Sequence, residues 1–260
     1  MTSTSFAAGS PCWIETLQPD PEAAASFYGE LFGWTFDEAG PGCSRVARLD
    51  GRRVAGVAQA PPMLDRGAWV MYVLVADLDG TVDAVQEAGG TVLAGPREVR
   101  DGERTALFTD PAGAAFGARE GSAPTVSEAV DVPNAWQMSA LHTPDIGVAQ
   151  TFYATVFGWH LDLMPGAALR LWRLGGSTRK AADPNLPDDV VAVASETPAA
   201  SGVPTHWAIN MQVSDADDFA DRVVELGGSI LMPPTDAPGF RNALIADPSG
   251  GVLAVSQIVR

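Results

Sequence analysis

Phe27 Tyr28 Gly29 Glu30 Leu31 Phe32 Gly33 Trp34 is a pattern that returns, almost letter for letter, as Phe152 Tyr153 Ala154 Thr155 Val156 Phe157 Gly158 Trp159. In each copy, aromatic and aliphatic residues at helical spacing precede a glycine, which can take the left-handed conformation at a helix C-terminus. A bulky tryptophan then opens the next segment. Each copy therefore predicts the end of an amphipathic helix, its stop and the start of a strand.

Two further motifs also occur twice. Ala88 Gly89 Gly90 Thr91 returns as Leu226 Gly227 Gly228 Ser229, and Asp110 Pro111 Ala112 Gly113 returns as Asp247 Pro248 Ser249 Gly250. The copies of the first motif are 125 residues apart (152 minus 27), whereas those of the last are 137 apart (247 minus 110). The second half therefore contains an insertion, which we expect in residues 175–204 as a long surface loop rich in Pro, Asp and Ala.

The repeats predict an α+β fold of four βαβββ modules, because internal repetition outweighs local propensity in a fold assignment. The helices are expected to be capped by Asp20, Asp77, Asp145 and Asp215. The predicted organisation is a disordered tail over residues 1–10, a first domain over 11–120, a linker over 121–133 and a second domain over 134–260. Whether modules pair within or across the two halves stays open.

Composition restricts the partners. The chain has 260 residues, is 46% hydrophobic, and carries 16 Lys and Arg against 32 Asp and Glu, a formal net charge of -16. Such a charge disfavours nucleic acid as a partner. No segment approaches the ~20 apolar residues of a membrane span, and no signal peptide is recognisable, so we expect a cytoplasmic protein without a membrane partner. Cys12 and Cys43 are expected to be reduced and structural, although a pair between adjacent strands stays open.

These motifs, in this order, resemble those of the vicinal oxygen chelate superfamily, which includes glyoxalase I, extradiol dioxygenases and bleomycin resistance proteins. The chain looks most like the fused two-domain, glyoxalase-like branch. The resemblance covers nearly the whole chain. It implies that paired modules curl into two half-barrel domains around concave cavities, with helices on the convex faces. It also implies a divalent metal ion held by His and Glu from the first and last strands of the modules.

The positions that the resemblance assigns to metal ligands lack suitable side chains. These positions are Trp13, Val70, Gly117, Met138, Ala208 and Ala254. The remaining Glu would come from the last strand of an odd module, for which we take residues 45–60 and 169–182, and neither contains Glu. We therefore expect no metal and no cofactor. A new site assembled from His142, His160 and His206 is the disfavoured alternative.

Strand alternation places other residues on the same inner face as those positions. The predicted ligand contacts are Trp13, Tyr72, Met138, His142, Asn210 and Gln212. Such a lining combines aromatic and apolar contacts with donors and acceptors, which suits an aromatic small molecule that bears oxygen. Alternatively, the polar groups face water in an open half-barrel. Trp69 and Trp207 point to the helices and are interpreted as core.

Two residues are candidates for acid–base chemistry. Glu15 lies beside Trp13 on the predicted inner wall and is a candidate general base. Alternatively, it pairs with an arginine such as Arg119, or is solvated. His206 is the second candidate, with a hydrogen-bonded strand-edge residue as the alternative.

The leading hypothesis is a metal-free protein, similar to glyoxalase and bleomycin resistance proteins, that binds a small aromatic or polyketide-like molecule in a cavity. It would act as a monomer or homodimer. The alternative is a cofactor-independent oxygenase, isomerase or cyclase of secondary metabolism that uses Glu15 or His206. A metal-dependent lyase or dioxygenase is disfavoured.

Overall fold

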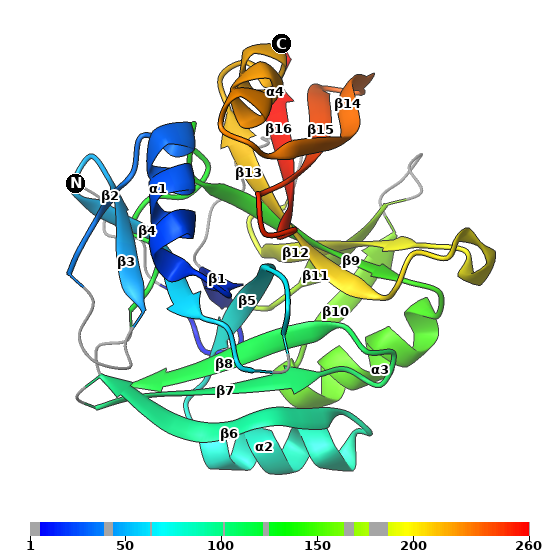
Figure 1. Ribbon diagram of the computed structural model, residues 1–260. Helices are drawn as coiled ribbons and strands as arrows, with labels where there is room; N and C mark the ends of the chain where they lie inside the picture. Colours follow the sequence, from blue (N-terminus) through cyan, green and yellow to red (C-terminus); the bar gives the residue numbers. More distant parts are fainter. Residues whose placement is uncertain are drawn as a thin grey trace. The chain divides into compact units, whose positions relative to one another are not determined.

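A computed structural model describes residues 6–38, 44–62, 64–100, 102–121, 125–163, 169–176 and 187–259. It contains four βαβββ modules, which confirms the predicted fold class (Figure 1). The first two modules consist of β1 (Pro11–Gln18), α1 (Pro21–Phe32), β2 (Thr35–Phe36), β3 (Arg45–Leu49) and β4 (Arg52–Gln59), then β5 (Ala68–Leu74), α2 (Leu78–Glu87), β6 (Thr91–Arg100), β7 (Glu103–Thr109) and β8 (Ala115–Gly121). The third and fourth consist of β9 (Trp136–Thr143), α3 (Ile146–Phe157), β10 (His160–Leu163), β11 (Arg170–Arg173) and β12 (Val190–Glu196), then β13 (His206–Val213), α4 (Ala216–Glu225), β14 (Ser229–Ala237), β15 (Phe240–Ala246) and β16 (Val252–Ile258).

Each helix begins at the predicted aspartate. In α1, the Asp20 side chain accepts hydrogen bonds from the free N–H groups of Glu22 and Ala23. Asp145 caps α3 in the same way, as do the aspartates that precede α2 and α4. Gly33 and Gly158 end α1 and α3 with φ of 71° in both cases, a conformation that favours glycine. The repeated motif is therefore a helix stop in both halves.

The strands form two eight-stranded mixed sheets. Their orders are β2-β3-β4-β1-β5-β8-β7-β6 and β10-β11-β12-β9-β13-β16-β15-β14. In each module the first strand lies parallel to the last, as in β1 with β4 and β5 with β8, because a helix returns the chain between them. The other pairs that follow in sequence are antiparallel. Both sheets repeat one connectivity, as the sequence repeats predict.

The chain divides into two compact units that do not coincide with its sequence halves. The first unit comprises Met1–Trp13, Met71–Thr125 and Met138–Trp207, and the second comprises Ile14–Val70, Val126–Gln137 and Ala208–Arg260. The first unit thus combines most of the second and third modules, and the second unit combines most of the first and fourth. Modules pair across the halves in these units.

The repeated motifs meet in the core of each unit. In the second unit, the Trp69 Nε1 donates to the Tyr28 hydroxyl at 2.9 Å, and this hydroxyl donates to the Asp247 Oδ2 at 2.6 Å. In the first unit, Trp207 Nε1 donates to Tyr153 at 2.7 Å, and Tyr153 donates to Asp110 at 3.1 Å. All six residues are buried. The interpretation of Trp69 and Trp207 as core is confirmed, and the tyrosine of one half binds the turn aspartate of the other.

The two tryptophans that close the repeated motif also have equivalent partners. Trp34 donates through Nε1 to the carbonyl oxygen of Asn134 at 2.9 Å, and Trp159 donates to that of Gly9 at 2.7 Å. Asn134 and Gly9 each lie just before the first strand of a half, β9 or β1. Gly9 also donates through its N–H to the carbonyl oxygen of Leu74 at 2.7 Å, while residues 1–5 of the predicted tail lie outside the described residues.

The expected insertion loop needs a correction. Residues 175–204 were expected to form one surface loop, but β12 lies within them, and its Val190–Ala194 run is buried. An apolar, β-branched run forms a strand when a sheet edge is available to pair with it. Residues 177–186 of the insertion lie outside the described residues.

The linker between the halves is buried in part. Thr125, Ser127 and Ala129 are each less than 5% exposed, and the Ser127 hydroxyl donates to the carbonyl oxygen of Val54.

Cys12 is a buried free thiol, and burial raises its pKa to about 12. Cys43 lies outside the described residues, so its predicted state stays a prediction.

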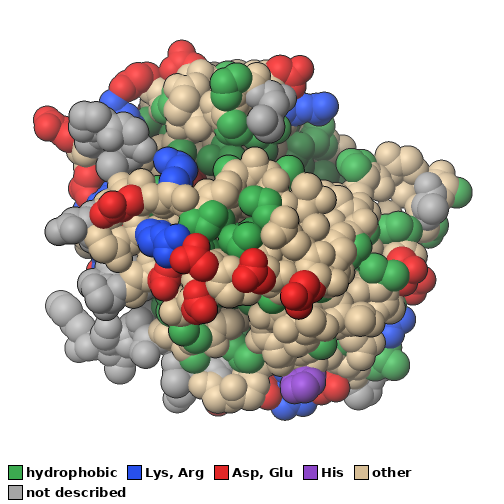
Figure 2. Space-filling model, turned by 90° about the horizontal axis from the view of Figure 1, so that it is seen from below, with side chains coloured by type: hydrophobic (Ala, Val, Ile, Leu, Met, Phe, Trp, Pro, Cys, Tyr) green, Lys and Arg blue, Asp and Glu red, His purple; other side chains and the backbone are tan. Residues whose placement is uncertain are grey.

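The surface agrees with the composition. Figure 2 shows acidic side chains spread among apolar ones over one face, with few basic side chains between them. Among the described residues, no helix combines the length and apolar character needed to cross a bilayer.

Candidate functional site

Trp13 and Tyr72, two of the predicted ligand contacts, hold a buried arginine in the first unit. The Arg119 Cζ lies 5.4 Å from the centroid of the Trp13 ring and 5.1 Å from that of the Tyr72 ring. Arg119 Nη1 donates to Glu103 Oε1 at 2.5 Å and to the carbonyl oxygen of Thr125 at 3.1 Å. Thr125 in turn donates to Glu103 through its N–H and its hydroxyl. We call these five residues the arginine cluster.

The arginine cluster is sealed from solvent. None of its members is more than 5% exposed. A buried charge is tolerated where it is paired and hydrogen-bonded, and here an ion pair, two aromatic faces and a backbone carbonyl meet that requirement. The faces of Trp13 and Tyr72 that were predicted to contact a ligand therefore contact a guanidinium.

Gly117 shows why this part of the chain does not fit the family's metal ion. The resemblance assigns a Glu ligand to this position, but a Cβ there would lie 2.3 Å from Tyr72 Cδ1. No side chain can be placed at that distance without moving the ring. Trp13, another of the assigned ligand positions in this unit, offers no oxygen or imidazole donor.

The other predicted ligand positions do not fit a divalent metal either. Val70, Ala208 and Ala254 have hydrocarbon side chains, and Met138 offers only a thioether, a soft ligand. Within the described ranges, no three His, Cys, Asp or Glu residues group in a way that could hold a metal ion. The residues present therefore do not match the metal site that the resemblance implies.

One step of the sequence argument for that conclusion needs a correction. The last strand of the third module is β12, not the predicted 169–182, and β12 ends in a carboxylate, Glu196. In the register with β9, Ser195 pairs with His142 and Glu196 pairs with Thr143. Glu196 therefore lies on the opposite face from His142 and is paired with Arg170 at 3.6 Å.

Glu15, the predicted general base, is buried in β1. It is 2% exposed, and its Oε1 accepts a hydrogen bond from the Ser44 hydroxyl. Arg119, its suggested partner, forms its ion pair with Glu103 in the arginine cluster. A substrate would reach the Glu15 carboxylate only after the surrounding core had opened.

The equivalent strands of the second half differ in exposure. Every residue of β1 is buried, whereas in β9 the buried residues alternate with half-exposed ones from Met138 to His142. β5 is buried over its centre, whereas β13 alternates along its whole length. Alternation is the pattern of a strand with one face in the core and one face accessible. The inner face that is filled in the first half is therefore accessible in the second.

In the first unit, six residues share this face, and we call them the histidine wall; five are half-exposed, and the sixth, Val193, is buried. They are Met138, Ala140, His142, Val193, Ser195 and His206. Val193 pairs with Ala140 in the sheet, and Met138 and Ala140 pack against a cluster of Leu171, Val190 and Val193. The histidine wall thus has an apolar part at Met138 and a polar part at the histidines.

The two histidines are stacked. Their ring centroids are 4.9 Å apart, and the planes differ by 14°. His142 Nδ1 lies 2.9 Å from Ser195 Oγ, and His206 Nδ1 lies 2.8 Å from the carbonyl oxygen of Pro204. Burial, and secondly the charge of His206, lower the pKa of His142 below its usual value. His142 is therefore neutral at physiological pH.

Asn210 and Gln212, the other two predicted ligand contacts, lie further along β13 in the second unit. The Asn210 amide donates to Ser256 Oγ at 2.8 Å and to Gln137 at 3.4 Å. Ser256 also donates to Asn242 at 2.6 Å. Gln212 Oε1 is buried, with no hydrogen-bond partner among the described residues. Asn210 belongs to an internal polar network, and both residues remain predicted contacts.

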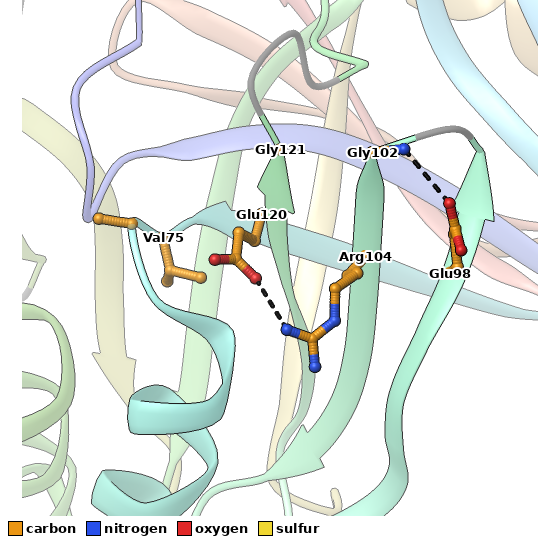
Figure 3. A pocket seen from close by; sticks show the side chains of 7 residues that line it. Val75, Glu98, Gly102, Arg104, Glu120 and Gly121 are labelled. Atoms are coloured by element: carbon orange, nitrogen blue, oxygen red, sulfur yellow. Dashed lines mark hydrogen bonds and ion pairs between the residues drawn. The ribbon is translucent and has the colours of Figure 1, made fainter.

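A separate open pocket of about 630 Å³ lies in the first unit (Figure 3). It is lined by Val75, Ala76, Glu98, Gly102, Arg104, Glu120 and Gly121. Arg104 is held by Asp79 at 2.8 Å and by Glu120 at 3.3 Å, while Glu98 accepts from the N–H of Gly102. None of the predicted site residues lines this pocket, and its arginine already has two carboxylate partners.

Sequence reasoning missed Glu103, Thr125 and Ser195. Glu103 and Thr125 bind Arg119 where β7, β8 and the linker meet, and no periodic pattern in the sequence indicates such a contact between separate segments. Ser195 could have been found, because it directly follows the apolar run Val190–Ala194, which is long enough for a strand.

Comparisons with known proteins agree with this architecture. A family model described as "Glyoxalase/Bleomycin resistance protein/Dioxygenase superfamily" matches residues 13–117 and 137–255. The chain is 33% identical over 274 residues to the anthracycline biosynthesis protein DauV of Streptomyces sp. (strain C5), with 98% of this chain and 95% of the relative covered. The chain is also 33% identical over 278 residues to the anthracycline biosynthesis protein DnrV of Streptomyces peucetius, with 98% of this chain and 95% of the relative covered.

Solved structures share the fold at lower identity. The crystal structure of the Mn(II)-bound glyoxalase from Novosphingobium aromaticivorans matches with a TM-score of 0.64 and 17% identity, over 97% of this chain and 83% of that one. At this identity, the likeness shows the fold alone.

Proposed function

Because the chain belongs to the glyoxalase/bleomycin resistance protein/dioxygenase superfamily, we propose that it binds a small, oxygen-bearing aromatic molecule on the histidine wall, without a metal ion. The observation that carries this proposal is the contrast in exposure between equivalent strands. The residues of β1 and of the centre of β5 are buried on both faces, whereas β9 and the start of β13 each have one half-exposed face.

The chemistry of the histidine wall suits such a ligand. Met138 and Ala140, which pack against the buried Val193, offer an apolar surface on which a flat ring can lie, and a thioether adapts to varied shapes. Ser195, His142 and His206 provide hydrogen-bonding groups at one end of that surface, which can orient oxygen substituents. A ligand with an apolar ring and a polar edge matches both parts.

The relatives support the class of molecule. Two of them are named as anthracycline biosynthesis proteins, and anthracyclines are polyketide-derived compounds with an oxygen-bearing anthraquinone core. We therefore take anthraquinones as probes.

The test uses 2-methoxyanthraquinone, which has no ionisable hydroxyl, and isothermal titration calorimetry. Met138→Lys places a charge on the apolar part of the histidine wall. We expect the affinity for the probe to fall by about tenfold or more, because the bound ring would desolvate the ammonium group. The matched control is Leu163→Lys, at a side chain of the same unit that is 66% exposed and lies outside the histidine wall. It should bind within about twofold of the unmodified protein.

Equal affinity of the Met138→Lys variant and the unmodified protein would contradict the proposal, as would failure of the unmodified protein to bind the probe. Thermal melting checks whether the variant is folded, and we expect it to be, because Met138 is half-exposed.

A further inference from the structure

The hydrogen bond of His206 fixes which of its ring nitrogens carries the proton. A backbone carbonyl oxygen can only accept a hydrogen bond, and that of Pro204 lies 2.8 Å from His206 Nδ1. Nδ1 is therefore the protonated nitrogen, and in the neutral ring Nε2 carries the lone pair. Within the described part of the chain, no residue hydrogen-bonds to Nε2. His206 thus presents a base on the histidine wall.

His142 favours proton uptake by His206 alone. The rings are stacked at 4.9 Å, so two positive charges would repel each other, and burial already disfavours the charged form of His142. Ser195 can donate to or accept from His142 Nδ1, so the neutral ring can take either tautomer. The lone pair of His206 Nε2 is therefore the acceptor that the pair offers to a ligand, while Nδ1 keeps its hydrogen bond to the Pro204 carbonyl.

The nearest charged side chain on the neighbouring strand β12, Glu196, forms an ion pair away from His142 and His206. Glu196 follows Ser195 on β12, points to the opposite face and pairs with Arg170 of β11. The groups on the same face as the histidines are the apolar Met138, Ala140 and Val193 and the neutral Ser195. Among these residues, no carboxylate competes with His206 for a proton from the ligand.

We propose that His206 accepts the proton of an acidic hydroxyl, phenolic or enolic, on the bound ligand, an inference that rests on the proposed function. The O–H bond of the ligand breaks, a bond from His206 Nε2 to hydrogen forms, and the electron pair stays on the oxygen. No electron is transferred to or from the ligand. The complex then contains a phenolate or enolate beside an imidazolium, so the ligand class narrows to hydroxylated aromatic or enolic molecules.

The test compares 2-hydroxyanthraquinone with its methyl ether, 2-methoxyanthraquinone. Ionisation of the hydroxyl moves the visible absorption band to longer wavelength, so the spectrum of the bound probe reports its protonation state. At a pH at which the free probe is neutral, the unmodified protein should bind it as the phenolate. His206→Gln should bind it as the phenol, with about tenfold lower affinity, because a charge-assisted hydrogen bond is lost.

The methyl ether has no proton to transfer, so the loss of affinity caused by His206→Gln should be clearly smaller for it than for the hydroxyl probe. The matched control variant is His160→Gln, which removes an exposed histidine of the same unit and should keep the phenolate band. Melting temperatures check that both variants are folded.

A second measurement needs no variant. The ¹⁵N shifts of the His206 ring should show a proton on Nδ1 alone in the complex with the methyl ether, and protons on both nitrogens in the complex with the hydroxyl probe. A neutral ring in both complexes, or a phenolate band that persists in His206→Gln, would overturn the inference and leave the proposed binding intact. Failure of both probes to bind would instead refute the proposed function, and this inference with it.

Discussion

The guanidinium of Arg119 carries a positive charge into a part of the first unit that solvent does not reach. Replacement by methionine would keep much of the side-chain volume but would leave Glu103 buried without its cation. Removal of one partner of a buried pair costs about 3–5 kcal/mol. We therefore expect the Arg119→Met variant to lose stability of that order, measured as the free energy of unfolding in urea.

The matched control is Arg104→Met, at the pocket of Figure 3. Arg104 also pairs with carboxylates, but its side chain is 40% exposed, and exposed pairs contribute little to stability. Equal losses from the two variants would show that the arginine cluster is not a buried core element.

For individual residues, the sequence predicts which face of a strand a side chain lies on, but it does not predict which groups pack against that side chain. Strand alternation predicts one inner face for Met138, His142 and His206, and all three are half-exposed in β9 and β13. It could not predict that Trp13 and Tyr72 enclose Arg119, because that contact also requires Glu103 and Thr125, which come from other segments. Alternation shows which way a side chain points, whereas the space in front of it depends on tertiary packing.

Among the elements, the hydrogen-bonded chain Trp207, Tyr153 and Asp110 joins a helix, a strand and a turn. Burial is the main cause of the raised pKa of Asp110, and it exceeds the opposing effect of the hydrogen bonds from Ala114 and Tyr153. As pH rises above about 3.9, the unfolded chain ionises at this residue before the folded chain does. The contribution of Asp110 to stability is therefore full at low pH and is lost as pH rises through the folded pKa.

The Asp110→Asn variant removes this titration. Its free energy of unfolding, relative to that of the unmodified protein, should rise as pH increases from about 3.9 through the raised pKa of Asp110, and should then level off. The exposed Asp79, whose pKa is lowered chiefly by its hydrogen bond with Arg104, is the matched control. Asp79→Asn should give a relative stability that falls with rising pH. Denaturation curves collected from about pH 3 to pH 8 measure both, and slopes of the same sign would contradict the assignment.

The element boundaries show what local signals can establish. Aspartate caps and the two left-handed glycines fixed the helices correctly, because those signals act within one turn. β12 was missed because it follows a Pro- and Asp-rich stretch that is typical of a loop, and its pairing partner β9 is about fifty residues away in sequence. A strand of this kind is identified by its partner as much as by its own residues.

For the whole molecule, the repeats predicted the number and order of modules but not the way they group. The compact units combine modules from different halves, and within them Tyr28 binds Asp247 and Tyr153 binds Asp110. A repeat shows that equivalent contacts exist without showing which copies make them. The proposed function rests on the difference between the copies, since the inner face of β1 and β5 is buried and that of β9 and β13 is half-exposed.

The most direct test is a calorimetric titration of the protein with 2-methoxyanthraquinone after exhaustive treatment with a chelator. We predict one bound molecule per chain, with an affinity that does not change when divalent metal ions are added back. Binding that requires the added metal, or a stoichiometry of two per chain, would contradict a single, metal-free site on the histidine wall.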